Sequence, residues 1–151
     1  MFPSSYLEVI LNYLSTRSTK DLALQFQKLS HSYRQLDCKN SGSTKQDVDA
    51  YLVGRLPLTF SVMCDLFNKL SPFLPSEFSV TDYGCGPATA LLALRTCFDK
   101  NMVSYLGIEG KQAMLDAAFY LDKNLLQQFL LKQLEIYNCN SHKQDMLFLQ
   151  N

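Results

Sequence analysis

The stretch TDYGCGPATA, residues 81–90, indicates how the second half of the chain folds. It continues a β-branched run, FSVTDY at 78–83, that is typical of a short strand. An apolar helical stretch follows at 88–99, so a strand leads through a tight turn into a helix. The same patterns predict a second strand, a long helix and a third strand at 102–108, 111–131 and 134–137. Strands that alternate with helices predict an α/β fold with a parallel sheet and right-handed crossovers.

The chain before this stretch is predicted to be helical. Apolar residues recur at helical spacing in four stretches, at 6–14, 19–36, 43–53 and 59–70. Thr19 is a candidate cap for the second helix, and Ser43 with Gln46 fits a capping box for the third. Pro57 is expected to end the third helix. The fourth helix is expected to bury Phe60, Met63, Leu66, Phe67 and Leu70.

The prolines at 72 and 75 separate these two patterns. We therefore expect a helical N-terminal segment at 1–75 and the start of a sheet domain at 76–151. Only about 70 residues follow the first predicted strand, enough for roughly three strands at usual connection lengths. The sheet domain is accordingly expected to be incomplete, so that the first strand has a neighbour on one side only. An apolar edge of this kind predicts self-association or pairing with a second chain.

The G-x-G turn of residues 84–86 carries the first chemical signal. Glycines allow the backbone to approach a ligand closely, and the N-terminus of the following helix offers N–H groups to a carboxylate. A dinucleotide site would need a third glycine where Thr89 stands, which favours a cofactor with an amino-acid head group. Asp82 can orient the turn and the amine of such a cofactor. The alternative is that Gly84 and Gly86 only form a tight turn.

Glu109 carries the second signal because it ends the second predicted strand. In doubly wound folds an acid at this point accepts hydrogen bonds from both hydroxyls of a ribose. Taken alone, Glu109 would be a solvated acid at a helix start. Together with the turn it predicts a cofactor site made of Asp82, Gly84, Cys85, Gly86 and Glu109.

Several other residues are weaker candidates for function. Arg55 is a candidate for contact with RNA or for pairing with a core acid, and Asp145 is a candidate partner for an adenine amino group. The thiol of Cys85 has no partner in the sequence that indicates a nucleophile, so it is expected to pack. Phe119 and Tyr120 are expected in the core. Cys139 and His142 form a lone C-x-x-H, which is too few ligands for a metal site.

Composition limits the classes of function. Lys and Arg total 14, as do Asp and Glu, so the sequence shows no basic footprint of nucleic-acid binding. The five cysteines include no C-x-x-C pair, which favours a reducing compartment over a disulfide framework. Residues 1–15 lack the basic and apolar regions of a secretory signal, so none is expected there, and the apolar stretches are shorter than a membrane span. These features predict a cytoplasmic protein, with the mitochondrial matrix as the alternative and no membrane partner.

Three parts of the sequence form one pattern in order and spacing. They are the pair Leu29-Ser30 followed by Tyr33-Arg34, an A-Y-L-x-x-R-x-P-x-T segment at 50–59 and a D-x-G-x-G-P-x-T-A segment at 82–90. In this pattern the chain resembles, over roughly residues 20–125, the methyltransferase-like family associated with the small ribosomal subunit, which has mitochondrial ribosome-assembly members and bacterial relatives. The combination of these segments is more specific than either motif.

This resemblance implies a class I, Rossmann-like methyltransferase fold, S-adenosylmethionine as cofactor, and ribosomal RNA or the small subunit as partner. Asp82, Gly84 and Gly86 match the family's cofactor loop, and Glu109 matches its acid after the second strand. Ala88 stands where the family often has glycine, and it is expected to resist a positive φ. No catalytic residue can be named, so the function is either methyl transfer or a non-catalytic assembly module. A dinucleotide-binding protein of another class is the third hypothesis.

Overall fold

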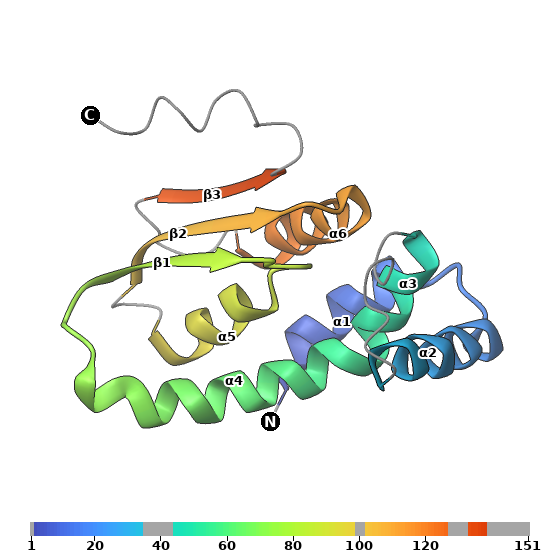
Figure 1. Ribbon diagram of the computed structural model, residues 1–151, viewed down its shortest axis with the longest axis horizontal. Coiled ribbons are helices and arrows are strands. Elements are labelled where there is room, and N and C mark those ends of the chain that lie inside the picture. The colour runs from blue at the N-terminus through green and yellow to red at the C-terminus, as the bar shows by residue number, and fades with distance from the viewer. Residues whose placement is uncertain (1, 35–43, 99–101, 127–132, 139–151) are drawn as a thin grey trace.

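The computed structural model describes residues 2–34, 44–98, 102–126 and 133–138. Three parallel strands, β1 (Phe78–Tyr83), β2 (Met102–Glu109) and β3 (Gln133–Asn138), form a sheet in the order β1-β2-β3 (Figure 1). Helix α5 (Thr89–Phe98) joins β1 to β2, and α6 (Gln112–Leu121) follows β2. This mixture of helices with a parallel sheet agrees with the predicted α/β class.

Strand and helix limits match the sequence pattern closely in this half. β1 has the predicted ends, and β2 and β3 are each within one or two residues of theirs. The long helix predicted at 111–131 is different, because α6 ends at Leu121 and a π-helical turn, Asp122–Leu126, follows it. The remainder of that prediction lies outside the described residues.

Three helices open the chain: α1 (Ser4–Tyr13), α2 (Thr19–Arg34) and α3 (Lys45–Ala50). Thr19 is the first residue of α2 and not its cap, since the hydroxyl of Ser18 accepts the N–H of Asp21 at 3.5 Å. The capping box of α3 is also one residue later than predicted. It pairs Thr44 with Asp47 in place of Ser43 with Gln46.

The prediction that Pro57 ends a helix is wrong. A π-helical segment, Tyr51–Arg55, continues α3 directly into α4 (Leu56–Leu70), which starts one residue before the proline. The N–H of Leu56 bonds to the carbonyl of Tyr51, five residues earlier, so the widened turn ends where the proline begins. Pro57 then sits at the first turn of α4, where its missing N–H is not needed.

The result is a helix of 29 residues from Lys45 to Phe73. By length and composition it could cross a membrane, which the sequence did not predict because the proline divides the apolar stretch. Helices that pack in the cores of soluble proteins pass the same test. Here α4 packs along α5, and Leu66 and Leu70 are exposed, although both were expected to be buried.

The main core lies where the N-terminal helices meet α5, α6 and β2. At one end of it Phe60 of α4 is 1% exposed and touches two aromatic rings edge-on. The ring centroids lie 5.0 Å away for Phe2 and 5.9 Å away for Tyr6. Helix α2 approaches closely as well, because a Cβ on Gly54 would overlap the ring of Phe26. A larger residue at position 54 would require Phe26 to move.

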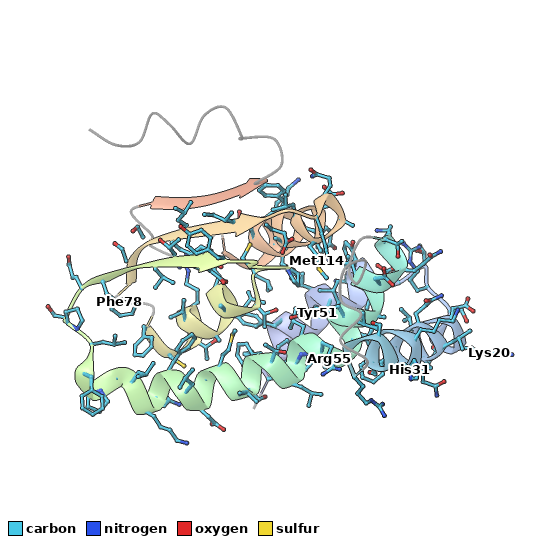
Figure 2. All side chains as sticks on the ribbon, viewed as in Figure 1. Lys20, His31, Tyr51, Arg55, Phe78 and Met114 are labelled. Atoms are coloured by element: carbon cyan, nitrogen blue, oxygen red, sulfur yellow. The ribbon has the colours of Figure 1, made fainter. Side chains whose placement is uncertain are left out.

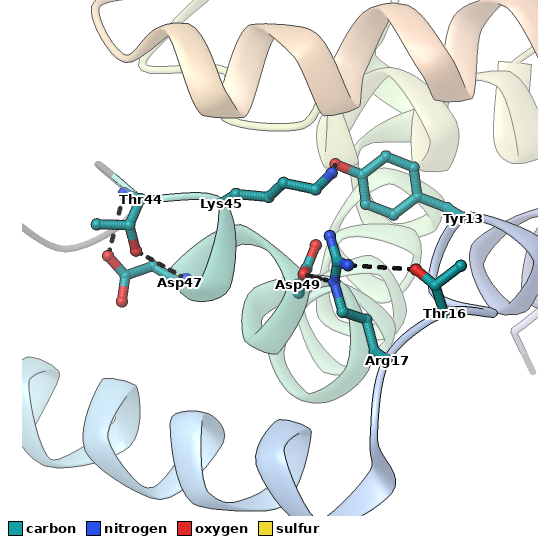
Figure 3. A network of polar contacts seen from close by, with 7 residues as sticks. All are labelled: Tyr13, Thr16, Arg17, Thr44, Lys45, Asp47 and Asp49. Atoms are coloured by element: carbon teal, nitrogen blue, oxygen red, sulfur yellow. Dashed lines mark hydrogen bonds and ion pairs between the residues drawn. The ribbon is translucent and has the colours of Figure 1, made fainter.

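Polar contacts fasten α1 and the loop after it to α3 (Figure 3). Nε of Arg17 lies 2.5 Å from Oδ2 of Asp49, and Asp49 is 2% exposed. Nζ of Lys45 donates to the hydroxyl of Tyr13 at 3.2 Å. The buried carboxylate raises the pKa of Arg17 through its hydrogen bond and its charge, so Arg17 stays positively charged.

Candidate functional site

The turn between β1 and α5 has an unusual backbone. Gly84, Gly86 and Ala88 have φ values of 76°, 56° and 61°. The expectation that Ala88 would resist a positive φ is wrong, although this conformation costs a non-glycine residue about 1–2 kcal/mol. Its N–H donates to the carbonyl of Cys85 at 3.0 Å, and its methyl group is buried in the core. Packing and hydrogen bonding therefore hold Ala88 in this conformation.

The N–H groups of this turn point at the end of β2. Those of Gly84 and Cys85 both donate to the carbonyl of Ile108, at 2.7 and 3.2 Å. The N–H of Gly86 donates to Oε2 of Glu109 at 2.9 Å. Since these donors are all used within the protein, the donors left for a ligand belong to the first turn of α5, where no helix supplies an internal acceptor.

Glu109 joins the two turns at this end of the sheet. Its other oxygen, Oε1, accepts the N–H groups of Gly110 at 2.8 Å and Lys111 at 2.9 Å. The residue is buried, and its carboxylate fixes the β1–α5 turn against the β2–α6 turn. Glu109 therefore lies against the G-x-G turn, and it is buried rather than solvated. Its predicted role in cofactor binding stays a prediction.

Asp82 has a partner that the sequence did not reveal. Oδ2 of Asp82 accepts the hydroxyl of Tyr105 at 2.7 Å, and Tyr105 is 1% exposed. Asp82 is aligned with Gly107 across the sheet, so Asp82, Tyr105 and Glu109 project from one face. Burial raises the pKa of Tyr105, and the charge of Asp82 raises it further. Tyr105 therefore stays a hydrogen-bond donor that orients the carboxylate.

Cys85 contributes its backbone to the turn and its side chain to the interior. The residue is 5% exposed, and Sγ lies where a Cβ on Gly107 would approach to 3.1 Å. Burial raises the pKa of Cys85 to about 12, and the charges of Asp82 and Glu109 add to this effect. A thiol that stays protonated is a poor nucleophile, so the packing role predicted for this side chain fits its surroundings.

This thiol predicts a measurable pH dependence. Its folded pKa lies above the unfolded value of about 8.5, so above that pH only the unfolded chain releases the proton. Stability is then expected to fall as pH rises from about 9 towards 12, and to be unaffected by this group below about 8. Urea denaturation of the wild type and of Cys85→Ala at about pH 8, and again at a pH between about 9 and 12, checks this prediction. An equal fall in the free energy of unfolding of both proteins as the pH rises would contradict it.

The backbone of the turn is open to a ligand. Among the described residues, no heavy atom beyond the chain neighbours lies within 4 Å of where a Cβ would stand on Gly84 or Gly86. A ligand can thus lie directly on this backbone. A carboxylate has about four acceptor sites, and Glu109 uses three. One acceptor site therefore remains for a ligand, and a second opens when the bond to Gly86 breaks.

The weaker candidates lie elsewhere. Arg55 projects from the π-helical segment among the N-terminal helices, away from the sheet (Figure 2). Phe119 is exposed, contrary to the expectation that it belongs to the core, whereas Tyr120 packs on Tyr13. Asp145 and the pair Cys139 and His142 lie outside the described residues. Among the described residues, no three His, Cys, Asp or Glu side chains gather as a metal site.

Among the described residues, two cavities lie outside the G-x-G turn. The larger, about 490 Å³, lies beside the Arg17–Asp49 pair and shares no residue with the G-x-G turn. The smaller, about 340 Å³, runs between α4, α5 and β1 and reaches Asp82. Size alone would favour the larger cavity, but the convergence of two strand ends favours the turn as the functional site. Comparison with protein-family models and with curated proteins finds no match to this sequence.

Proposed function

We propose that the chain binds S-adenosylmethionine at the turn between β1 and α5. The observation that carries this proposal is the meeting of the turn with Glu109 at the carboxyl ends of two neighbouring parallel strands. Ligands of open α/β sheets bind in that position, and an acid after the second strand suits a ribose. Thr89 in place of a third glycine disfavours a dinucleotide.

Each residue has a role in this proposal. Gly84 and Gly86 leave room for the amino-acid part of the cofactor, and the first turn of α5 faces its carboxylate. Asp82, oriented by Tyr105, accepts the amine directly or through water. Glu109 accepts the ribose hydroxyls. When bound, the cofactor supplies an activated methyl group, and the residues of this chain hold and orient it.

The wider proposal is that the chain is the cofactor-binding part of a Rossmann-like methyltransferase. By its resemblance, the acceptor is ribosomal RNA or the small ribosomal subunit, in the cytoplasm or the mitochondrial matrix. Catalysis of this type depends on holding donor and acceptor in line. Transfer of a labelled methyl group to small-subunit RNA by the purified chain tests this part separately from cofactor binding.

One observation favours a second candidate, a non-catalytic ribosome-assembly module. The oxygens of Glu109 already accept three backbone N–H groups, so the acid contributes to the architecture without any ligand. Cys85 and Tyr105 stay protonated near neutral pH, so neither serves as a base. In this candidate the chain keeps the fold, and the turn only stabilises it.

Titration calorimetry with S-adenosylhomocysteine decides between cofactor binding and architecture. We expect saturable binding, weakened about tenfold or more by Glu109→Gln, which removes an anionic acceptor but keeps one oxygen for the turn. Asp116→Asn is the matched control because Asp116 is an exposed acid on α6, and it should bind like the wild type. NAD should not compete.

The opposite outcome would be an absence of binding. A folded wild-type chain that does not bind S-adenosylhomocysteine would refute the cofactor proposal and support the assembly module. Competition by NAD would favour a nucleotide-binding protein of another class. Circular dichroism of each variant shows whether it is folded before its affinity is compared.

A further inference from the structure

The smaller cavity is a groove with one hydrogen-bonding wall and an apolar floor. Its wall is β1, and its floor is made by α4 and α5, through side chains that include Phe67, Leu70 and Leu94. Of its ten lining residues, only Asp82 is charged. In Figure 1, α4 lies on the side of β1 that faces away from β2. The part of the floor that α4 provides therefore extends beyond β1, the edge strand of the sheet.

The wall presents backbone groups without a strand beside them. Among the described residues, β1 pairs only with β2. The N–H of Gly84 points to Ile108 of β2, and successive backbone groups of a strand alternate in direction. The N–H and carbonyl groups of Ser79 and Thr81 therefore point into the groove. Such an edge is a template for another strand.

These two features together specify an extended peptide as the occupant. The backbone of an added strand would bond to Ser79 and Thr81, while alternate side chains would enter the apolar floor. A helix would satisfy none of those backbone groups. Parallel sheets are normally covered by other elements on both faces. Tyr83, on the face of β1 opposite to Asp82, is nevertheless 78% exposed.

A second copy that paired through its own β1 would bring its own α4 to the same edge of the sheet. That helix would compete for the space beside β1 in which α4 of the first copy already lines the groove. This steric conflict argues against the symmetric self-association expected from an open edge.

We propose that this groove is the docking site for an extended apolar segment of another polypeptide, which joins the sheet beside β1. The charge distribution agrees with such a partner, since a segment with acidic side chains would be repelled by Asp82 at the end of the groove. The proposal does not depend on cofactor binding at the turn.

The test uses a synthetic peptide of alternating valine and threonine with lysines at both ends. Titration followed by amide hydrogen exchange should show protection of Ser79 and Thr81 and little change at Val80 and Asp82. Leu70→Asp, on the floor, should weaken binding about tenfold or more. Leu58→Asp is the matched control because Leu58 is exposed on the same helix outside the groove, and it should bind normally.

Three results would overturn the proposal. The peptide fails to bind a folded chain, or it binds without protecting Ser79 and Thr81. The third result is that these amides are already protected in the free chain. Protection at all concentrations would mean that a segment of the chain itself covers the edge. Protection that increases with protein concentration would mean that a second copy covers it. Thr81→Pro, which removes one edge N–H, provides a second variant if Leu70→Asp does not fold.

Discussion

Replacing Glu109 with alanine is expected to lower the free energy of unfolding by about 3 kcal/mol. The substitution removes three hydrogen bonds between a buried carboxylate and backbone N–H groups, and each such bond contributes about 1.5–3 kcal/mol without strict additivity. The two turns at the end of the sheet also lose the contact that fixes them to one another. Urea denaturation followed by circular dichroism measures the change.

Two further variants make the Glu109 prediction specific. Glu109→Gln keeps an oxygen that can accept from Gly110 and Lys111, so we expect a smaller loss, about 1–2 kcal/mol. Asp116→Ala removes an exposed acid of α6 and should change stability by less than about 0.5 kcal/mol. Equal stability of Glu109→Ala and the wild type would show that the carboxylate does not hold the turns together.

Replacing Phe60 with alanine is expected to cost about 3–5 kcal/mol. Phe60 is 1% exposed and fills the space between α4 and the start of α1, where Phe2 and Tyr6 meet its ring edge-on. Truncation leaves a cavity and removes two aromatic contacts, so α1 should detach first. Thermal and urea denaturation give the loss, and exchange of the amides of α1 shows where it begins.

Phe73→Ala is the control for this second prediction. The side chain of Phe73 is 83% exposed, so its removal should change stability by less than about 0.5 kcal/mol. A loss at Phe73 as large as the loss at Phe60 would mean that the exposed end of the long helix is buried in solution. That result would contradict the packing described for α4.

Sequence patterns predicted the sheet half better than the helical half. The ends of β1 follow from a β-branched run that stops at a glycine, which are local properties. The prediction at Pro57 was wrong because proline interrupts the interior of an α-helix. Here a π-helical turn ends just before the proline, which therefore lies in the first turn of α4. The exposure of Leu66 and Leu70 depends on which side of α4 faces α5, which periodicity does not fix.

The candidate site was predictable in its parts but not in its connections. Glu109 and the glycine turn carry their signals in sequence, since both follow strands. The hydroxyl of Tyr105 meets Asp82 only because β1 and β2 pair in one register, and register is not visible in either strand alone. Ala88 was misjudged because its backbone preference is overridden by burial of its methyl group.

The hydrogen bond from Gly86 to Glu109 sets a limit on affinity at this site. A ligand that needs both acceptor sites of Oε2 binds only those molecules in which this bond is open, because Oε1 is occupied by the N–H groups of Gly110 and Lys111. Its apparent dissociation constant equals the intrinsic one divided by the fraction of open molecules. If opening costs about 1.4 kcal/mol, nine molecules in ten are closed at any moment and the apparent affinity falls about tenfold. A partner that held the turn open would recover that factor without touching the ligand.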